Sequence, residues 1–232
     1  YKSYSTTGHI SHLIKFMSEN VPKVEVQNIV ATFGLGHVID MDNLVKAISF
    51  VEYNRKRFAA ATMRLKHPRS TALIFSSGNL VCTGTQTLED ALLASRRFVH
   101  ILICYNVVPK IRMHNFCIQN VVASAQFSNM LNLKALYEAN AEMSSYEPQM
   151  FPGLIIRHVD AQNIVALVFR SGKIVLTGGK CKVTLQSIFA NTYFPIIKHY
   201  LDVSGPLNSA EYHAMIYRER FHEAQQNQNE NF

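Results

Sequence analysis

Two pairs of residues that could ligate a metal stand three positions apart, His9 with His12 and His114 with Cys117. A structural zinc site needs four ligands at compatible spacings, and neither pair has two further ligands near it. The sequence also lacks a glycine-rich phosphate loop, a nucleophile elbow and an HExxH helix, and its acidic residues form no evident catalytic pair. The residue types therefore predict a protein without a metal, a cofactor or enzymatic activity.

The composition favours a basic globular protein. Hydrophobic residues make up 48% of the chain and the net charge is +7, so a polyanionic partner such as nucleic acid is expected. No apolar run reaches the roughly 20 residues of a membrane-spanning helix, and the first residues do not resemble a signal peptide. The cysteines are scattered without a CxxC pair, which suits a reducing compartment. They are Cys82, Cys104, Cys117 and Cys181.

The charge and the sequence are duplicated along the chain. Residues 27–106 hold nine Lys/Arg and five Asp/Glu, and residues 107–202 hold the same numbers. The segment 27–31 (QNIVA) recurs as 119–123 (QNVVA), an offset of 119 − 27 = 92, and 71–84 recurs as 165–178, an offset of 165 − 71 = 94. Between them, Phe58 lines up with Phe151. A repeat of about 90 residues is too long for a solenoid unit and indicates a duplicated α/β half.

Each half is predicted to follow the order β-α-β-β-β-β-α and to form one antiparallel sheet with helices on a single face. Gly78 and Gly172 are the expected hairpin-turn residues. Strands are expected at 24–33, 57–65, 71–75 and 80–83 in the first half, and at 115–127, 153–159, 164–169 and 174–177 in the second. Short helices are expected at 40–50, with Asp40 as the N-cap, and at 132–141, and long helices at 88–105 and 183–200.

The predicted strands are apolar on both of their faces. In 72–75 and 80–83 almost every residue is apolar, and this pattern taken alone favours a sheet buried on both sides. The predicted helices are too few to cover both sides, however. An uncovered apolar face beside duplicated basic residues suits a partly apolar, strongly anionic ligand such as the DNA minor groove, and would also allow the free protein to form a homodimer.

Four segments resemble the core of the TATA-box-binding protein family: 52–60 (EYNRKRFAA), 71–78 (TALIFSSG), 144–154 (SSYEPQMFPGL) and 172–178 (GKIVLTG). The resemblance extends from about Val24 to Leu201. It implies an α+β fold in which two pseudo-symmetric repeats, 24–110 and 111–202, form one curved antiparallel sheet, a saddle, with helices on the convex face. Residues 1–23 would be an N-terminal extension with a short helix near 10–17. Residues 203–232 would be a C-terminal extension with a helix at 209–223 and a Gln/Asn-rich tail.

The resemblance implies that the sheet binds the minor groove and that phenylalanines wedge between base steps, for which the family is a known example. The intercalating residues would be Phe58, Phe75, Phe151 and Phe169. An asparagine amide can donate to the acceptors that A·T and T·A pairs share. The base contacts would be Asn28, Asn120, Val30, Val122, Leu73, Leu167, Val81, Val175, Thr83 and Thr177, of which the aliphatic members could instead belong to the sheet core.

Phosphate contacts are expected to supply most of the salt-dependent affinity and little sequence information. By resemblance they are Arg57, Arg64, Ser77, Arg157, Ser171, Lys173 and Lys180. Two departures from the family pattern affect this surface. Asn79 and Gln86 stand where the first repeat usually has lysines. Residues 158–163 carry an apparent one-residue insertion that could shift a hairpin or add a bulge.

The family's partners are also expected by resemblance. The second stirrup loop, with Glu147, Gln149 and Met150, would bind a transcription factor IIB-like protein, although Gln149 and Met150 replace a glutamate and a leucine. Transcription factor IIA-like proteins and TBP-associated factors would be further partners, in the nucleus and without a membrane. The resemblance thus predicts a general initiation factor that binds and bends TATA-like DNA and nucleates the preinitiation complex. The alternative is a scaffold that binds transcription factors but has lost tight TATA binding.

Overall fold

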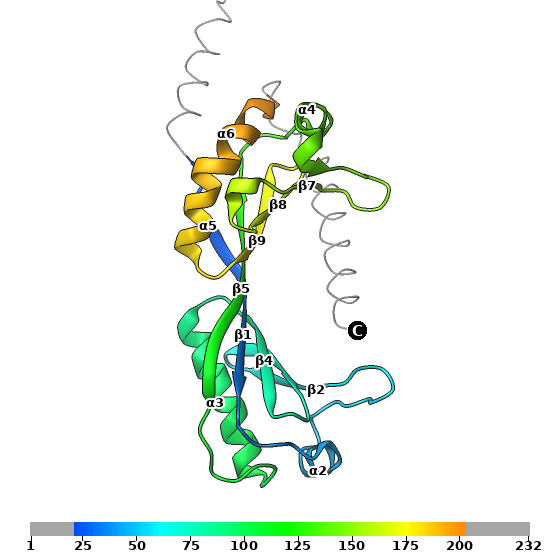
Figure 1. Cartoon of the computed structure of the whole chain (residues 1–232), viewed down its shortest axis with the longest axis vertical. Coiled ribbons are helices and arrows are strands. Elements are labelled where there is room, and N and C mark those ends of the chain that lie inside the picture. Colours follow the sequence, from blue (N-terminus) through cyan, green and yellow to red (C-terminus); the bar gives the residue numbers. More distant parts are fainter. Residues whose placement is uncertain (1–20, 203–232) are drawn as a thin grey trace, which may run out of the picture. The chain divides into compact units, whose positions relative to one another are not determined.

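The computed structural model describes residues 21–202, which form two compact units. The first-repeat unit comprises residues 26–123 and 177–182, and the second-repeat unit comprises residues 21–25, 124–176 and 183–202 (Figure 1). The strands form one nine-stranded antiparallel sheet in the order β2-β3-β4-β1-β5-β9-β8-β7-β6. The α+β fold with one antiparallel sheet, predicted from the sequence, is confirmed. The helices predicted near 10–17 and 209–223 and the tail at 225–232 lie outside the described residues.

The first repeat contains four strands and two helices before the chain continues into β5. Helix α2 begins after Asp40, whose side-chain oxygen accepts hydrogen bonds from the backbone N–H groups of Asp42 and Asn43 at 2.9 and 3.1 Å, as the N-cap prediction requires. Helix α3 packs against β3 and β4. The elements are β1 (Glu25–Gly34), α2 (Met41–Ala47), β2 (Ala61–Lys66), β3 (Arg69–Ile74), β4 (Asn79–Thr85), α3 (Leu88–Cys104) and β5 (His114–Gln126).

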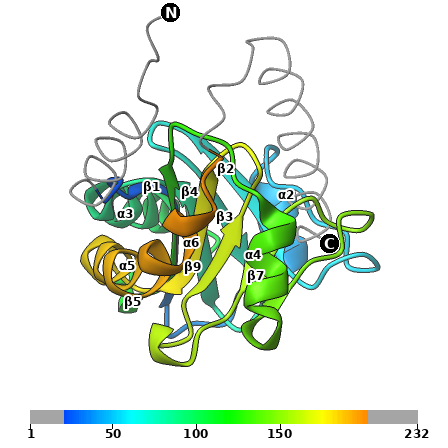
Figure 2. The same ribbon diagram turned by 90° about the horizontal axis from the view of Figure 1, so that it is seen from above.

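The second repeat has the same order but more short elements, and Figure 2 shows α4 next to β7. Its regular elements are α4 (Leu133–Ala139), β6 (Ser144–Ser145), β7 (Leu154–Ile156), β8 (Val165–Val168), β9 (Lys173–Gly179), α5 (Lys182–Ile188) and α6 (Phe194–Ile197). Single 3-10 turns are at Ala141–Met143, Val159–Ala161 and Lys198–Tyr200, and a π-helical turn is at Phe189–Tyr193.

The strand predicted at 57–65 begins only at Ala61. The backbone N–H groups of Arg57 and Phe58 both donate to the carbonyl of Asn54, at 2.9 and 3.0 Å, so these residues form a turn. The predicted order, with four consecutive strands after the first helix, is observed in the second repeat. In the first repeat, a single bridge between Glu52 and Thr62 stands where the second repeat has β6.

The helix predicted as continuous over 183–200 is divided into α5, the π-helical turn, α6 and a 3-10 turn. Pro195 lies at the start of α6, where a missing N–H group is tolerated. The buried Tyr193 hydroxyl donates to the carbonyl of Ile164 at 2.5 Å and so ties the π-helical turn to the residue that precedes β8. A π-turn carries one residue more than an α-turn, and this extra residue shifts which side chains face the core.

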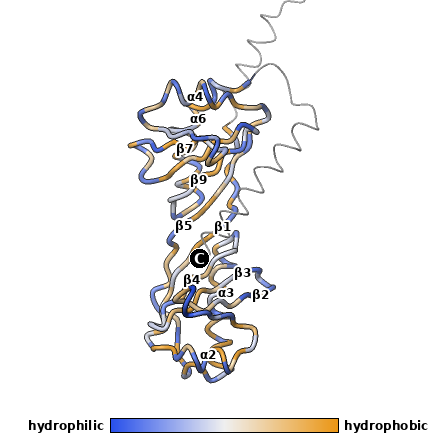
Figure 3. The backbone as a smooth tube through the Cα atoms, turned by 90° about the vertical axis from the view of Figure 1, so that its right-hand side faces the viewer, coloured by the Kyte–Doolittle hydropathy of each residue, from blue (hydrophilic) through white to orange (hydrophobic). Residues whose placement is uncertain are grey.

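Exposure alternates along the strands although hydropathy does not. In β4, Leu80 and Cys82 are buried whereas Val81 and Thr83 are half-buried, and β8 and β9 alternate in the same way. The sheet is therefore not buried on both sides, as the apolar pattern alone favoured. Figure 3 shows β9 and its neighbours mostly in hydrophobic colours. The hydropathy pattern therefore could not distinguish the buried strand face from the half-buried one.

The apparent insertion at 158–163 neither shifts the hairpin register nor adds a bulge. β7 and β8 pair without interruption, Leu154 with Val168 and Ile156 with Ala166. The extra length is taken up by the 3-10 turn Val159–Ala161 and by Gln162 and Asn163, which have φ of 50° and 68°. Within residues 21–202, no helix has the length and apolar character needed to cross a membrane, and no three His, Cys, Asp or Glu side chains lie together as a metal site would require.

Candidate nucleic-acid interface

The ten residues predicted to contact bases are all half-buried, and each has at least one buried chain neighbour in its strand. Leu73 on β3 lies directly opposite Val81 on β4, and Val81 lies opposite Thr32 on β1, so these three side chains form a row across the first-repeat strands. In the second-repeat unit, Leu167 on β8 lies opposite Ile155 on β7. Each repeat therefore presents aliphatic and hydroxyl side chains on the strand face away from its core.

Asn28 is held by its neighbours on β4. Its amide nitrogen donates to Thr83 Oγ1 at 3.0 Å, and its amide oxygen accepts from the backbone N–H of Gly84 at 2.8 Å. Gly84 has a φ of 97°, in the left-handed region, and a Cβ there would lie 3.3 Å from Ser70 Cα. A side chain at this position would be strained, so the Thr-Gly pair is what allows the backbone N–H to face the asparagine.

Asn120 makes the same contacts in the other repeat. Its amide nitrogen donates to Thr177 Oγ1 at 3.0 Å and its oxygen accepts from Gly178 N–H at 2.9 Å. Because a backbone N–H can only donate, these bonds determine which end of each amide is oxygen. An amide nitrogen carries two N–H groups and the threonine accepts from one. The second is a donor that the half-buried face can present to a ligand.

The predicted wedge residues form two edge-to-face pairs. The ring centroids of Phe58 and Phe75 are 6.4 Å apart at 63°, and those of Phe151 and Phe169 are 5.7 Å apart at 70°. Each hairpin is closed in the same way: the backbone N–H of Phe75 donates to Asn79 and that of Phe169 to Lys173, both at 2.9–3.0 Å. The apparent insertion has therefore not disturbed the second pair.

The two pairs differ in exposure because of one residue. Phe58, Phe75 and Phe151 are half-buried, whereas Phe169 is only 2% exposed. Gly153 stands two residues after Phe151, where the first repeat has Ala60 two residues after Phe58. A Cβ on Gly153 would lie 2.7 Å from Phe151 Cε1 and 3.0 Å from Phe169 Cε1. The missing side chain lets both rings pack closely, so only Phe151 reaches the surface.

The predicted phosphate contacts are not equivalent. Arg57, Ser77, Arg157 and Lys180 are exposed and Lys173 is half-buried, but Ser171 is only 3% exposed and has little surface to offer. Arg64 Nη1 lies 2.7 Å from Glu52 Oε1 in an exposed salt bridge. Hydrogen bonding from the Arg64 guanidinium, and its charge, lower the pKa of Glu52, so this carboxylate is ionised at neutral pH and offsets the charge of Arg64.

The second stirrup loop is exposed throughout Glu147, Gln149 and Met150, and Met150 is 78% exposed. Its turn is closed by backbone N–H groups of Met150 and Phe151, which both donate to Glu147 at 2.9 Å. The first-repeat loop is closed by the equivalent bonds to Asn54. In Figure 1 the loop next to β2 extends away from α3, and the loop next to β7 extends away from α5.

The sequence reasoning missed residues that continue the same strand faces. Thr32 and Ser124 are half-buried and stand four positions after Asn28 and Asn120. Strand side chains at i, i+2 and i+4 share a face, so this spacing could have identified them. Gln119 also donates to Thr32 Oγ1 at 2.7 Å, between β5 and β1.

Comparisons with known proteins agree with this geometry. The family described as "Transcription factor TFIID (or TATA-binding protein, TBP)" matches residues 23–105 and 115–200. The chain is 43% identical over 175 residues to the TATA-box-binding protein of Artemia franciscana, covering 75% of this chain and 62% of that one. It is 41% identical over 179 residues to TATA box-binding protein-like 2 of Rattus norvegicus, covering 77% and 51%.

The solved structure of Methanococcus jannaschii TBP is similar as well, with a TM-score of 0.65 and 30% identity, covering 77% of this chain and 99% of that one. The chain spans only 51% and 62% of the lengths of the two relatives named above. The matched family is one of transcription factors, which agrees with the expectation that the chain is not an enzyme. On the matched residues and the shared fold, the chain belongs to the TATA-binding protein family.

Proposed function

We propose that this chain is a general transcription initiation factor that binds the minor groove of A/T-rich promoter DNA through its half-buried strand faces and bends it. The observation that carries the proposal is the identical hydrogen bonding of Asn28 and Asn120, which orients one amide donor in each repeat. The names of the relatives, TATA-box-binding proteins, support it.

The chemistry of the faces fits the minor groove. Its floor presents only the acceptors A N3 and T O2 at A·T pairs, and amide and threonine donors complement them. A G·C pair adds the N2 amino group, a donor that would face these donors without an acceptor and would clash with the adjacent valines. The half-buried aliphatic side chains Leu73, Val81 and Val30 would pack on the sugars and groove floor, where a charged surface would lose hydration without compensation.

The wedge is proposed to come from Phe58 and Phe151. Both are half-buried, both lie just after a closed turn, and each rests on a second phenylalanine that limits its movement. A ring supported from behind can enter a base step without first being ordered, and family members are known to insert apolar wedges in this way.

The same proposal includes the protein partners and the location. The exposed second stirrup loop offers Glu147 and Met150 to a transcription factor IIB-like protein, and α3 offers exposed Arg96 and Arg97 to transcription factor IIA-like or TBP-associated proteins. Assembly on promoter DNA would place the protein in the nucleus, where it would nucleate a preinitiation complex.

A second candidate function is a scaffold that binds transcription factors without tight TATA binding. Three observations favour it: Arg64 is paired with Glu52, Ser171 is buried, and Asn79 and Gln86 are uncharged. Each of them reduces the positive charge or the polar surface available to phosphates on one side of the interface.

The deciding experiment is DNA bending measured by fluorescence energy transfer across a TATA-containing duplex. We expect strong bending with the wild-type chain, and its loss with a G·C-substituted duplex and with the Phe58→Ala/Phe151→Ala variant. Phe50→Ala is the matched control, because Phe50 is 48% exposed and contacts Tyr105 rather than the interface. If the TATA duplex is not bent at moderate salt, the scaffold function replaces this one.

A further inference from the structure

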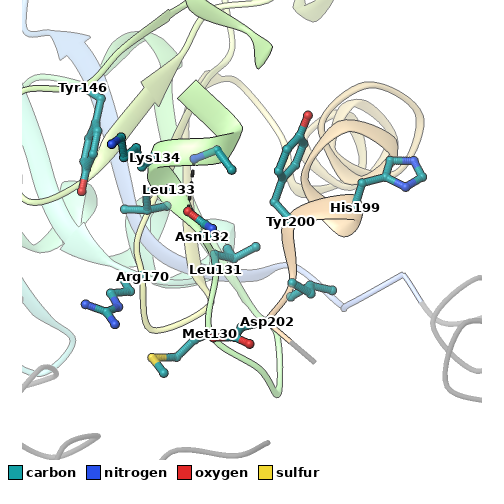
Figure 4. A pocket seen from close by; sticks show the side chains of 12 residues that line it. Met130, Leu131, Asn132, Leu133, Lys134, Tyr146, Arg170, His199, Tyr200 and Asp202 are labelled. Carbon is teal, nitrogen blue, oxygen red and sulfur yellow. Dashed lines mark hydrogen bonds between the residues drawn. The ribbon is translucent and has the colours of Figure 1, made fainter. Parts of the chain in front are cut away.

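The second-repeat unit contains a cavity of about 560 Å³ beside the start of α4. One wall is Met130 to Ala135 and another is the segment from His199 to Asp202. The backbone N–H of Asn132 donates to Tyr200 at 2.9 Å, and that of Asp202 to Met130 at 2.7 Å, so the two walls are joined. Figure 4 shows Leu131 and Leu133 between Tyr146, Lys134 and Arg170 on one side and Tyr200 and His199 on the other.

The cavity is apolar at its base and basic at its mouth. Its apolar surface comes from half-buried Met130, Tyr146, Tyr200 and Leu201, because Leu131 and Leu133 are only 2–3% exposed. The Lys134 side chain is 82% exposed and Arg170 is exposed. Among the lining residues within 21–202, Asp202 is the one carboxylate, so their formal balance is 2 − 1 = +1 with His199 neutral. Lys134 lies 3.8 Å from Glu138, a fully solvated pair that neutralises the ammonium only weakly.

The equivalent place in the first repeat carries the opposite charge. The equivalence is shown by matching backbone bonds: Leu131 N–H donates to Arg170 O, and Ile39 N–H donates to Ser76 O, both at 2.9 Å. These pairs are related by the repeat offsets, 131 − 39 = 92 and 170 − 76 = 94.

By the same offsets, the two aspartates of the first repeat have no acidic counterpart in the second. Asp42 stands in the first repeat where Lys134 stands in the second, and Asp40 stands where Asn132 stands. Ser76 stands in the first repeat where Arg170 stands in the second, so these three positions carry a formal charge of −2 in the first repeat and +2 in the second. The two repeats are alike in backbone and opposite in charge at this one place.

The acidic loop of the first repeat also exposes an apolar side chain. Val38, two residues before Asp40, is 72% exposed. Its loop is held against the hairpin turn, since a Cβ on Gly78 would lie 2.0 Å from His37 O, and Ile39 is bonded to Ser76. Residues 36–43 (GHVIDMDN) therefore form a preformed loop with a valine at its surface and two aspartates beside it.

We propose that the cavity of the second-repeat unit binds loop 36–43 of another copy of this chain. Val38 would enter the cavity and pack on its half-buried apolar lining, such as Met130 and Leu201. Asp40 and Asp42 would face Lys134 and Arg170 at the mouth. The two contact surfaces are different, so the contact is heterologous. In a pair of copies, one keeps its loop unused and the other keeps its cavity unused. One loop in one cavity buries far less than the ~1,200 Å² of a stable interface, so the association is weak and reversible.

This contact uses neither the strand faces nor the phenylalanine pairs. It is therefore distinct from a homodimer formed through the apolar strand face, and it does not depend on the proposed DNA binding. Because it joins opposite charges at an exposed mouth, salt weakens it.

The test is sedimentation velocity of the full chain over a wide concentration range, at low and high salt. The wild-type chain should associate at low salt and dissociate at high salt. The cavity variant Lys134→Glu/Arg170→Glu and the loop variant Asp40→Asn/Asp42→Lys should each stay monomeric. Asparagine keeps the helix cap of α2 while removing its charge, and glutamate suits the start of α4, so both variants should fold, which circular dichroism checks.

An equimolar mixture of the two variants provides the decisive test. The unchanged loop of the cavity variant then meets the unchanged cavity of the loop variant, and the two altered surfaces are also opposite in charge. We expect the mixture to associate although neither variant does so alone. The proposal is overturned if the wild-type chain remains monomeric at low salt, if either variant associates as the wild type does, or if the mixture does not recover. Association of the wild type that a Val81→Asp variant abolishes, while the cavity variant leaves it intact, would assign the contact to the strand face instead.

Discussion

Asn28 and Asn120 show how little side-chain chemistry the proposed recognition needs. Each amide is oriented by a glycine N–H on one end and a threonine hydroxyl on the other, so the donor that faces outward is determined before a ligand arrives. Preorganised donors lose less conformational entropy on binding than free side chains do. The pairing also explains why a Thr-Gly pair occurs near the end of both β4 and β9.

Asn120→Asp should weaken binding of a TATA duplex by about tenfold or more. The aspartate keeps an oxygen for Gly178 N–H but replaces both N–H donors with an oxygen that repels the base acceptors. Fluorescence anisotropy titration measures the affinity, and Asn191→Asp, on the π-helical turn, is the matched control. An unchanged affinity would remove Asn120 from the interface.

Glu52→Gln should strengthen DNA binding a few-fold. The pKa of Glu52 is lowered, chiefly by the hydrogen bond from Arg64, so at neutral pH its negative charge is present and competes with phosphate. Glutamine keeps the size and removes that charge. Competition titrations against the wild type measure the change, with Glu142→Gln as a control for loss of an exposed acid. Weaker binding would mean that Glu52 positions Arg64 instead.

At the scale of elements, the loop before β7 and the hairpin after β8 meet at Gly153, which lies against one phenylalanine from each. The first repeat has a Cβ at the equivalent Ala60 and keeps both of its phenylalanines half-buried. The second repeat lacks that Cβ and buries Phe169. One methyl group thus separates two otherwise matching wedge pairs.

Gly153→Ala should displace Phe151 and Phe169 and destabilise the fold by about 1–3 kcal/mol, because the new Cβ overlaps both rings. Urea unfolding measures the stability and energy transfer measures the bend, which should also decrease. Ala60→Gly is the matched change in the first repeat, where it should leave the bend nearly unaltered. A Gly153→Ala protein as stable as the wild type would show that the rings move without cost.

The divided helix after β9 depends on Tyr193. Its hydroxyl bonds the Ile164 carbonyl inside the second-repeat core, and burial raises the pKa of this phenol above its usual value. A raised folded-state pKa stabilises the fold below the unfolded pKa, and the contribution is lost as the pH rises through the folded value. The protein should therefore lose stability in alkaline solution.

Tyr193→Phe should cost about 1–2 kcal/mol at neutral pH, because the Ile164 carbonyl loses its partner. It should also reduce the alkaline loss of stability. Urea unfolding at neutral and alkaline pH measures both effects, and Tyr137→Phe, a half-buried tyrosine on α4, is the control. Burial raises the pKa of Cys82 too, but this acts equally in both proteins and cancels in the comparison. An equal alkaline loss in both proteins would contradict the assignment to Tyr193.

At the scale of the whole molecule, the proposed function assigns the strength of DNA binding to the positive charge and the choice of DNA sequence to the strand faces. Arg57, Arg64, Arg157, Lys173 and Lys180 are the proposed phosphate contacts, drawn from both repeats. Affinity carried by phosphate contacts falls with salt in proportion to their number.

The logarithm of the TATA-binding constant should therefore fall with the logarithm of salt concentration with a slope of about −4 to −5. Lys180→Ala should make the slope shallower by about one, whereas Lys110→Ala, an exposed lysine outside the proposed contacts, should not change it. Anisotropy titrations across a salt series measure the slope. A slope near zero would show that phosphates contribute little to binding.

Much of the fold and of the candidate site was determined by local sequence. The repeat of 71–84 at 165–178 placed matching strands and turns, and Asp40 was readable as a cap because its bonds reach only two and three residues along the chain. The glycine turns follow from backbone sterics alone, with φ of 82° at Gly78 and 83° at Gly172. The asparagine and phenylalanine sets were named from the resemblance to the family, and their matching positions in the two repeats are visible in the sequence.

Only the tertiary structure decided which apolar residues face the core, because both strand faces are apolar and hydropathy cannot distinguish a helix-covered side from an open one. The burial of Phe169, the pairing of Arg64 with Glu52 and the break at Tyr193 depend on contacts with residues 12 to 29 positions away. The cavity depends on Leu131 bridging to Leu201. Such contacts form only when packing brings distant segments together, so no local pattern in the sequence reports them.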